Sequence, residues 1–196
     1  MADGSDQPAS RRDIKLVVVG DGTVGKTCLC YTYKQGSFPD DDEHRPTIFD
    51  NSYIDLLLDG RPLNLNVWDT AGQEEFERLR PLMYPKTDVF LLCYAINNVT
   101  SFNNIMIKWA PELRKHCPSA RIMLVATKAD CRGGDTETNV DRARGRRLAV
   151  KKLKADGFVE CSARTGEGVI EAFETAVRTV LDGPQLGSEG CACALV

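Results

Sequence analysis

The hydrophobic pattern of the chain divides it into short expected strands. Continuous apolar runs, typical of parallel strands buried on both faces, occur at residues 14–19, 89–94 and 122–126. A short last strand is expected at residues 158–160. Residues 49–58 and 62–68 carry strand-like apolar spacing, and the Asp59-Gly60 dipeptide between them favours an antiparallel hairpin.

Apolar residues at helical spacing lie between these strands. Helices are expected at residues 25–35 with Gly36 as the stop, at 139–156 and at 169–181. Another should precede the strand at 122–126, with its apolar face at Phe102, Ile105, Met106, Trp109 and Leu113. Pro111 should kink that helix, because proline lacks a backbone donor. The alternation predicts an α/β layered fold with a mostly parallel sheet.

Composition limits the class of protein. The chain has 196 residues, of which 42% are hydrophobic and 27% charged, which suits one globular domain. A net charge of −3 gives no electrostatic footprint for nucleic acid. No run approaches a membrane span and no apolar signal region opens the chain, so we expect an intracellular protein. The cysteines are too scattered for a zinc site or a disulfide framework. We expect a flexible extension at residues 1–13, a folded domain at 14–182 and a flexible tail at 183–196.

The strongest motif is the loop after the first strand. Residues 20–27 fit the phosphate-loop pattern G-x-x-x-x-G-K-[ST] at every fixed position. Its glycines let backbone N–H groups converge on phosphate oxygens, Lys26 adds a positive charge, and Thr27 offers a hydroxyl to Mg²⁺. The alternative is an ordinary glycine-rich turn, but the Lys-Thr pair and the preceding strand favour a Mg²⁺–nucleotide site.

Two further segments follow expected strands. Residues 69–74 (Asp-Thr-Ala-Gly-Gln-Glu) come directly after the second hairpin strand, where ligand groups sit in an open α/β sheet. The Asp130 carboxylate accepts hydrogen bonds only, so it matches the two adjacent N–H donors of guanine and not the acceptor and donor of adenine. Lys128 can lay its methylene stem on the base.

These motifs, followed by Cys161-Ser162-Ala163, resemble those of the Ras-superfamily small GTPases. The Rho family is the best match, through residues 46–51, Trp68 and residues 78–88. The likeness covers residues 15–181 and resumes at the last four residues. It implies a small G domain of the P-loop NTPase class, with helices on both faces of a six-stranded, mostly parallel sheet that has one antiparallel edge strand. It also implies a monomer that binds GTP, GDP and Mg²⁺, hydrolyses GTP to GDP, and controls effectors of cytoskeleton, cell shape, polarity and trafficking.

The resemblance assigns roles to individual residues. The expected nucleotide-binding residues are Asp21, Gly22, Thr23, Val24, Gly25, Lys26, Thr27, Cys28, Phe38, Thr47, Gly72, Thr127, Lys128, Asp130, Ser162 and Ala163. Thr27, Thr47 and, through water, Asp69 are the expected Mg²⁺ residues, with Thr47 joining only when GTP is bound. The expected catalytic residues are Gln73, which orients the attacking water, Lys26, and Gly72, whose N–H contacts the γ-phosphate. Phe38 should lie edge-on to guanine, and the Ala163 N–H should reach its carbonyl.

The resemblance also implies partners. Effectors should bind residues 47–51 and 74–84, and a guanine-nucleotide exchange factor (GEF), a GTPase-activating protein (GAP) and a GDP-dissociation inhibitor (GDI) are the other expected classes. No arginine matches a finger supplied in cis, so hydrolysis should be slow without a GAP. Arg78 and Arg80 are expected to be interface or solvent residues.

Several positions depart from the Rho pattern. Thr127 stands where other branches of the superfamily have Asn, which suggests looser anchoring of the base-binding loop. The switch loop is acidic, two residues longer than usual, and has His44 in place of Tyr; either GTP holds this loop less tightly or His44 is merely exposed. Only 32 positions separate Asp130 from Ser162, which favours an abbreviated insert loop at residues 132–138. Seven Arg and Lys residues crowd residues 142–154, either as a solvated helix face or as a surface for acidic partners or lipid headgroups.

Two other classes of function remain open at this stage. A P-loop kinase or ATPase would share the phosphate loop but lack a guanine reader such as Asp130. A GTP-loaded binding module with little hydrolysis would agree with His44 and the longer switch loop. Gln73 and Gly22 favour hydrolysis over that alternative.

The last four residues, Cys-Ala-Leu-Val, fit the C-a-a-X pattern and make Cys193 the expected prenylation site. One lipid chain gives only marginal membrane binding, so a second signal is needed. No Lys or Arg follows residue 181 to bind anionic lipid, so Cys191 is the expected second signal, as a palmitoylation site. The terminal Val leaves the prenyl type open. We therefore expect the protein on the cytoplasmic face of plasma and internal membranes, and in the cytosol when not anchored.

Overall fold

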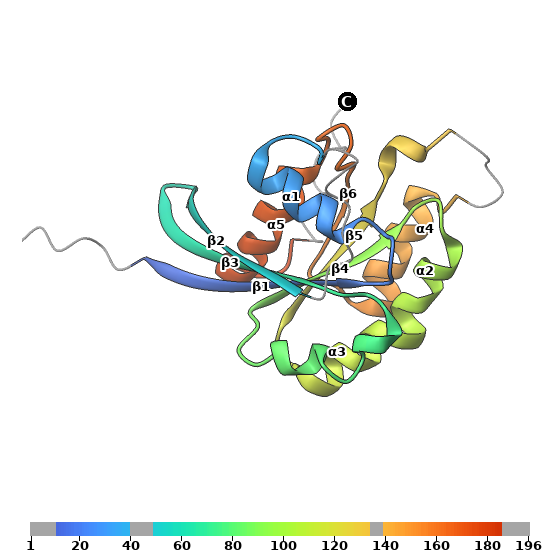
Figure 1. Cartoon of the computed structure of the whole chain (residues 1–196), viewed down its shortest axis with the longest axis horizontal. Coiled ribbons are helices and arrows are strands. Elements are labelled where there is room, and N and C mark those ends of the chain that lie inside the picture. The colour runs from blue at the N-terminus through green and yellow to red at the C-terminus, as the bar shows by residue number, and fades with distance from the viewer. Residues whose placement is uncertain (1–10, 40–48, 134–138, 186–196) are drawn as a thin grey trace, which may run out of the picture.

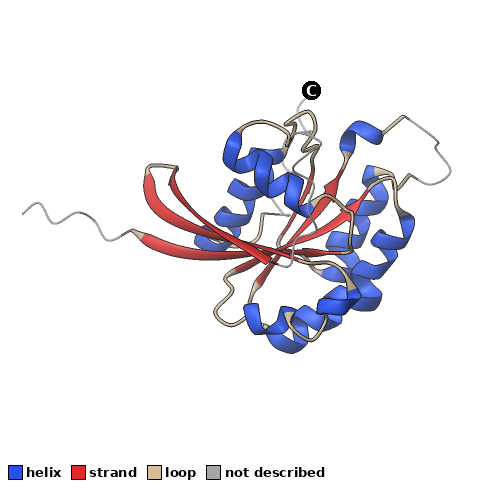
Figure 2. Ribbon diagram, viewed as in Figure 1, coloured by secondary structure: helices blue, strands red, loops and turns tan. Residues whose placement is uncertain are grey.

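In the computed structural model, which describes residues 11–39, 49–133 and 139–185, six strands form one sheet in the order β2-β3-β1-β4-β5-β6. The strands are β1 (Arg12–Gly20), β2 (Phe49–Leu58), β3 (Arg61–Thr70), β4 (Val89–Ala95), β5 (Arg121–Thr127) and β6 (Gly157–Glu160). Only the β2–β3 pair is antiparallel, and β2 is an edge strand. The expected fold class is therefore confirmed (Figures 1 and 2).

Helices cover both faces of this sheet (Figure 2). The α-helices are α1 (Lys26–Gln35), α2 (Val99–Asn104), α3 (Ala110–His116), α4 (Arg142–Arg147) and α5 (Val169–Asp182). Short 3₁₀ turns occur at Glu74–Phe76, Arg80–Met83 and Ala129–Cys131. No helix among the described residues is long and apolar enough to cross a membrane.

Two hydrophobic clusters explain why the parallel strands are continuously apolar. Along β1, Leu16 and Val18 belong to the cluster that contains residues of α1 and α5. Val17 and Val19 belong to the other cluster, with residues of α2, α3 and the α4 region. Since successive side chains of a strand point to opposite faces, a strand covered on both sides needs an apolar residue at every position.

The hairpin forms as the sequence predicts. Asp59 has φ 50° and Gly60 has φ 77°, and this pair of positive angles is typical of the type I′ turn that joins antiparallel strands tightly. The first strand begins earlier than expected. Arg12 and Asp13, assigned to the flexible extension, pair with Leu63 and Asn64 of β3.

Pro111 does not produce a simple kink. The helix changes from α2 to a π-helical segment, Ile105–Trp109, and Pro111 then lies in the first turn of α3. A proline has no N–H and its ring crowds the carbonyl four residues earlier, so the wider π-turn just before it accommodates both effects. A second π-segment, Leu148–Leu153, follows α4 in the expected basic helix.

Candidate nucleotide-binding site

A cavity of about 940 Å³ lies where β1, β3 and β5 end at their carboxyl edges. Open α/β sheets bind ligands at this edge. The predicted residues that line it are Gly22, Thr23, Val24, Gly25, Lys26, Thr27, Cys28, Phe38, Gly72, Gln73, Thr127, Lys128, Asp130 and Ala163. Asp21, Asp69 and Ser162 do not line the cavity, but each is hydrogen-bonded to a residue that does: Lys26, Thr27 and Asp130, respectively. Thr47 and His44 lie outside the described residues.

The cavity also contains residues that the sequence did not single out. They include Tyr31, Asn97 and Arg164. Asn97 comes shortly after β4, so the rule that ligand groups follow parallel strands could have found it. Tyr31 and Arg164 belong to no motif, and nothing in the local sequence marks them.

The phosphate loop connects β1 to α1 in a conformation that its glycines permit. Gly20 has φ 142°, and a β-carbon there would lie 2.3 Å from the carbonyl oxygen of Cys93 on β4. Gly25 has φ 92° at the N-terminus of α1. Thr23 has φ 62°, a left-handed angle that is strained for a β-branched residue and that supports a functional loop.

The Lys26 side chain lies within this loop and is 6% exposed. Its ammonium donates to the carbonyl oxygens of Gly20 at 2.9 Å and Asp21 at 2.8 Å. Burial lowers the pKa of Lys26, while the charges of Asp69 and Asp21 oppose that shift. A buried lysine whose charge is only partly compensated favours an anionic ligand such as a phosphate.

Thr27 and Asp69 meet at the metal-binding position that the sequence predicts. The Thr27 hydroxyl donates to Asp69 Oδ2 at 2.6 Å, and Asp69 is 4% exposed. A hydroxyl and a carboxylate are hard oxygen ligands, and Mg²⁺ is commonly held by one or two such groups together with water and substrate phosphates. The residues present therefore fit Mg²⁺.

The other end of the cavity has a carboxylate held in one orientation. Ser162 is fully buried, and its hydroxyl donates to Asp130 Oδ1 at 2.6 Å. Lys128 precedes this carboxylate in a left-handed conformation with φ 61°. The Ala163 carbonyl accepts from the Thr32 hydroxyl at 3.2 Å, which ties this loop to α1.

Thr127 connects the two ends of the cavity. Its hydroxyl lies 2.5 Å from the Val24 carbonyl oxygen in the phosphate loop and 3.1 Å from that of Tyr94 on β4. One hydroxyl proton serves both acceptors, and the side chain is 3% exposed. Threonine at this position therefore still binds the phosphate loop directly.

The segment after β3 packs against the phosphate loop. Gly72 is buried, and a β-carbon there would lie 2.3 Å from the Gly20 carbonyl oxygen. Gln73 is exposed, and its Cγ would be 3.7 Å from a β-carbon added at Gly22. The predicted catalytic residues Lys26, Gly72 and Gln73 thus surround one end of the cavity.

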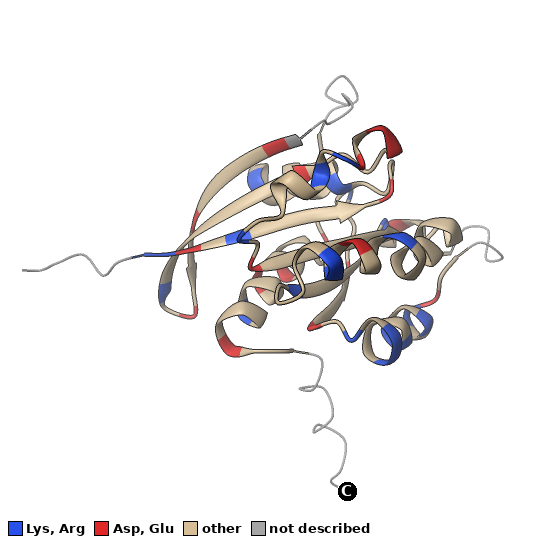
Figure 3. Cartoon of the chain, turned by 90° about the horizontal axis from the view of Figure 1, so that it is seen from below, with Lys and Arg blue, Asp and Glu red and all other residues tan. Residues whose placement is uncertain are grey.

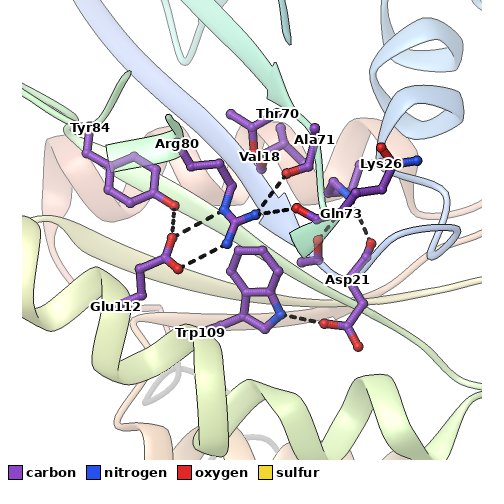
Figure 4. Close-up of polar contacts among 11 residues, drawn as sticks. Val18, Asp21, Lys26, Thr70, Ala71, Gln73, Arg80, Tyr84, Trp109 and Glu112 are labelled. Atoms are coloured by element: carbon purple, nitrogen blue, oxygen red, sulfur yellow. Dashed lines mark hydrogen bonds and ion pairs between the residues drawn. The ribbon is translucent and has the colours of Figure 1, made fainter. Parts of the chain in front are cut away.

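The expectation that Arg80 is an interface or solvent residue is wrong. Arg80 is 2% exposed, and its guanidinium donates to the Gln73 carbonyl at 2.9 Å and the Ala71 carbonyl at 3.4 Å (Figure 4). It also pairs with Glu112 of α3 at 3.1 Å. The buried Tyr84 hydroxyl donates to the same carboxylate. Its neighbour Arg78 is exposed, as expected.

Trp109 extends this network to the phosphate loop. The Arg80 guanidinium lies 4.6 Å from the centre of the Trp109 ring. The indole N–H donates to Asp21 Oδ1 at 2.7 Å, and Asn104 donates to Asp21 Oδ2 at 2.7 Å. Trp109 was expected only as an apolar core residue, although a buried indole needs an acceptor. The α2–α3 helix thereby contacts both the phosphate loop and the Gln73 segment (Figure 4).

The site defines a P-loop nucleotide-binding domain. One cavity joins the phosphate loop, the Thr27–Asp69 pair beside it and the Asp130 carboxylate at its other end. The model of the Ras family matches residues 15–182. The chain belongs to the Ras family and, within it, to the Rho-type small GTPases.

Known proteins of this family align with almost the whole sequence of this chain. The Ras-like GTP-binding protein RhoL of Drosophila melanogaster is 45% identical over 180 residues, which cover 92% of this chain and 93% of that protein. The Rho-related GTP-binding protein RhoB of Homo sapiens is 44% identical over 187 residues, with 90% and 93% covered. The protein is therefore a GTPase that binds GTP, GDP and Mg²⁺ and acts as a molecular switch in Rho-type signalling. Effectors, GEFs and GAPs are its classes of partner.

Proposed function

We propose that the cavity holds Mg²⁺–GTP with the phosphates on the Lys26 loop and guanine on Asp130. The observation that carries this proposal is the Ser162–Asp130 hydrogen bond of 2.6 Å, because it fixes an acceptor-only group at the end of the cavity opposite Lys26. Lys128 covers the base with its methylene stem, Phe38 contacts its edge, and the Ala163 N–H reaches its carbonyl.

Thr27 and Asp69 would hold Mg²⁺, Asp69 through water, and Thr47 joins them when GTP is bound. When bound, the ion supplies positive charge that stabilises the phosphate oxygens during cleavage. Lys26 compensates further negative charge, the Gly72 N–H contacts the γ-phosphate, and Gln73 orients the attacking water. The remaining phosphate-loop residues contribute backbone N–H groups, and Asp21 fixes the loop through Trp109.

Hydrolysis is slow without a partner. Arg80, which donates to the Gln73 carbonyl, is also engaged with Glu112 and the Ala71 carbonyl, so it does not serve as a finger. Small GTPases that lack a finger in cis turn over at roughly 10⁻⁴ to 10⁻³ s⁻¹. A GAP supplies the missing charge.

Effectors bind residues 47–51 and 74–84 in the GTP state. The exposed apolar side chains of Leu79 (50%) and Leu82 (68%) support this surface, because large exposed apolar residues mark interaction sites. Loss of the γ-phosphate releases both segments from the nucleotide and ends the interaction. A GDI is a further partner, and the protein acts as a monomer.

The folded domain at residues 14–182 carries a lipidated tail at 183–196. Cys193 is prenylated and Cys191 palmitoylated, although both lie outside the described residues. The two lipids together hold the protein on the cytoplasmic face of plasma and internal membranes, and the singly lipidated protein returns to the cytosol.

Nucleotide competition tests this assignment. Purified protein is loaded with a fluorescent GDP analogue, and GTP, GDP and ATP are added in the presence of Mg²⁺. GTP and GDP should displace the analogue at far lower concentrations than ATP, because adenine presents an acceptor to Asp130. Equal displacement by ATP and GTP would show that Asp130 does not read the base.

A further inference from the structure

Residues 142–154 carry a concentration of positive charge found nowhere else in the sequence. They include seven Arg and Lys residues and no Asp or Glu, in a chain with 25 basic and 28 acidic residues. The rest of the chain therefore has 18 basic residues against 28 acidic ones. Residues 142–153 form α4 and the π-segment that follows it, which together we call the basic helix, and Figure 3 shows Lys and Arg residues gathered there.

The charged side chains face outward because the helix has a separate apolar side. Leu148, Ala149 and Leu153 are buried in the hydrophobic cluster that also contains Trp109. Residues 150–152, which lie between Ala149 and Leu153, are exposed, and so is Arg147 just before Leu148. This packing holds the cations on one rigid element and does not leave them on a loop.

Four of the cations form one wall of a groove of about 450 Å³. They are Arg144, Arg147, Lys151 and Lys152, which we call the basic groove residues. The facing wall comes from α2 and the π-segment after it, and it is mostly apolar, with Phe102, Met106 and Ile107 beside Asn103.

The positive charge of this groove is not neutralised within the described part of the chain. Arg147, Lys151 and Lys152 pair with none of the carboxylates that the structure describes. Arg144 stacks on Phe102 at 4.8 Å. Ile107, 75% exposed, adds an apolar side chain at the rim. Cations beside an exposed aliphatic side chain suit the headgroup region of a membrane.

The C-terminal tail leaves the domain close to this helix. The Gln185 N–H donates to the Asp156 carbonyl at 2.6 Å, and Asp156 comes three residues after the π-segment Leu148–Leu153. The eleven residues beyond Gln185 contain the C-a-a-X cysteine but no Lys or Arg. A lipid on that tail therefore brings the end of this helix near the membrane, while the tail itself adds no positive charge.

We propose that the basic groove binds the surface of an anionic membrane and supplies the electrostatic attraction that the tail lacks. The proposal rests on the lipidated tail described above for its cellular role. On this proposal the second membrane-binding signal lies in the folded domain and not in the tail. Because the groove is part of a rigid helix, its contact with the bilayer also sets the orientation of the domain.

Vesicle sedimentation tests the groove without any lipid anchor. Full-length, GDP-loaded, unprenylated protein is sedimented with vesicles of phosphatidylcholine alone or mixed with phosphatidylserine. We expect binding only to the mixed vesicles, and weaker binding as salt is raised. The triple variant Arg147→Gln, Lys151→Gln, Lys152→Gln should bind roughly ten- to a hundredfold more weakly, because each Lys or Arg near such a surface changes affinity by a factor of about five.

A matched variant controls for net charge. Arg11→Gln, Arg12→Gln, Arg61→Gln also removes three exposed cations, from β1, β3 and the residue before β1, and should bind like the wild-type protein. GDP affinity should be unchanged in both variants, since neither touches the nucleotide cavity. Thermal stability should change little, because the control loses only the exposed ion pairs Arg11–Asp55 and Arg61–Asp182. Equal vesicle binding by both triple variants, or equal wild-type binding to neutral and anionic vesicles, would overturn the proposal.

A cell experiment separates this proposal from that of lipidation. Cys193→Ser should abolish the membrane fraction even with the groove intact, because the groove alone binds weakly. The groove variant with Cys193 intact should show a reduced membrane fraction. If Cys193→Ser leaves the membrane fraction unchanged while the vesicle results hold, the prenylation assignment is wrong and membrane binding by the groove is still supported. An unchanged membrane fraction in the groove variant would contradict the role of the groove.

Discussion

Single residues at the base end of the cavity decide which nucleotide the protein selects. The Ser162 hydroxyl donates to Asp130 Oδ1 and so holds the carboxylate in one orientation, and both oxygens keep lone pairs that can accept from guanine. In Asp130→Asn the same hydroxyl selects the amide oxygen and leaves the NH₂ group toward the base. A donor then faces the donors of guanine.

We therefore expect Asp130→Asn to lose GTP affinity and to gain affinity for xanthosine triphosphate. A hydrogen bond to a charged group contributes about 1.5–3 kcal/mol, which corresponds to a loss of roughly ten- to a hundredfold. Displacement of a fluorescent nucleotide by both triphosphates measures the change. Unaltered preference for GTP would rule out Asp130 as the base-reading residue.

Ser162→Ala tests the support of that carboxylate. The substitution removes the 2.6 Å hydrogen bond and leaves Asp130 free to turn away from the base, so nucleotide affinity should fall roughly tenfold. GTP and GDP should weaken by the same factor, because this end of the cavity does not contact the phosphates. A loss confined to one of the two nucleotides would contradict the placement.

At the scale of elements, the buried Arg80 joins the segment after β3 to the α2–α3 helix. Its guanidinium contacts Gln73, Ala71 and Glu112, and only the first of these positions was predicted to matter. No local sequence pattern distinguishes Arg80 from Arg78, since the two are only two residues apart in the same segment. Which of them is buried depends on the short 3₁₀ turns, which have no periodic pattern.

Arg78 and Arg80 form a matched pair for a stability experiment. Arg80→Ala leaves Glu112 buried without its partner and should lower the free energy of unfolding by about 3–5 kcal/mol. Arg78→Ala changes an exposed side chain and should alter it by less than about 0.5 kcal/mol. Urea unfolding of the GDP-bound proteins compares them, and similar values for both variants would refute the structural role of Arg80.

The π-segments show a second limit of sequence analysis at this scale. Pro111 marked the position of an irregularity correctly, because it removes a backbone donor wherever it stands. The form that the helix takes there depends on packing. Trp109 ends the π-segment with its indole N–H bonded to Asp21, a contact between residues 88 positions apart that no local pattern contains.

At the scale of the whole molecule, the sequence predicted the α/β fold with its mostly parallel sheet, and the edge of the sheet where the cavity lies. Buried parallel strands need apolar residues on both faces, and the phosphate and base motifs begin in the last residues of β1, β3 and β5. The exact start of β1 was missed because Arg12 and Asp13 are polar, although they pair with β3. Polar residues are compatible with the end of a strand where their side chains reach solvent, as those of Arg12 and Asp13 do.

The central claim is that this domain is a GTP switch whose hydrolysis depends on Gln73. Single-turnover hydrolysis of bound GTP, with and without a Rho-type GAP, tests it most directly. The wild-type protein should hydrolyse GTP slowly alone and roughly 10³- to 10⁵-fold faster with the GAP, whereas Gln73→Leu should bind GTP normally and show almost no stimulation. A wild-type protein that retains its GTP with the GAP present, or a Gln73→Leu variant that is stimulated equally, would contradict the account.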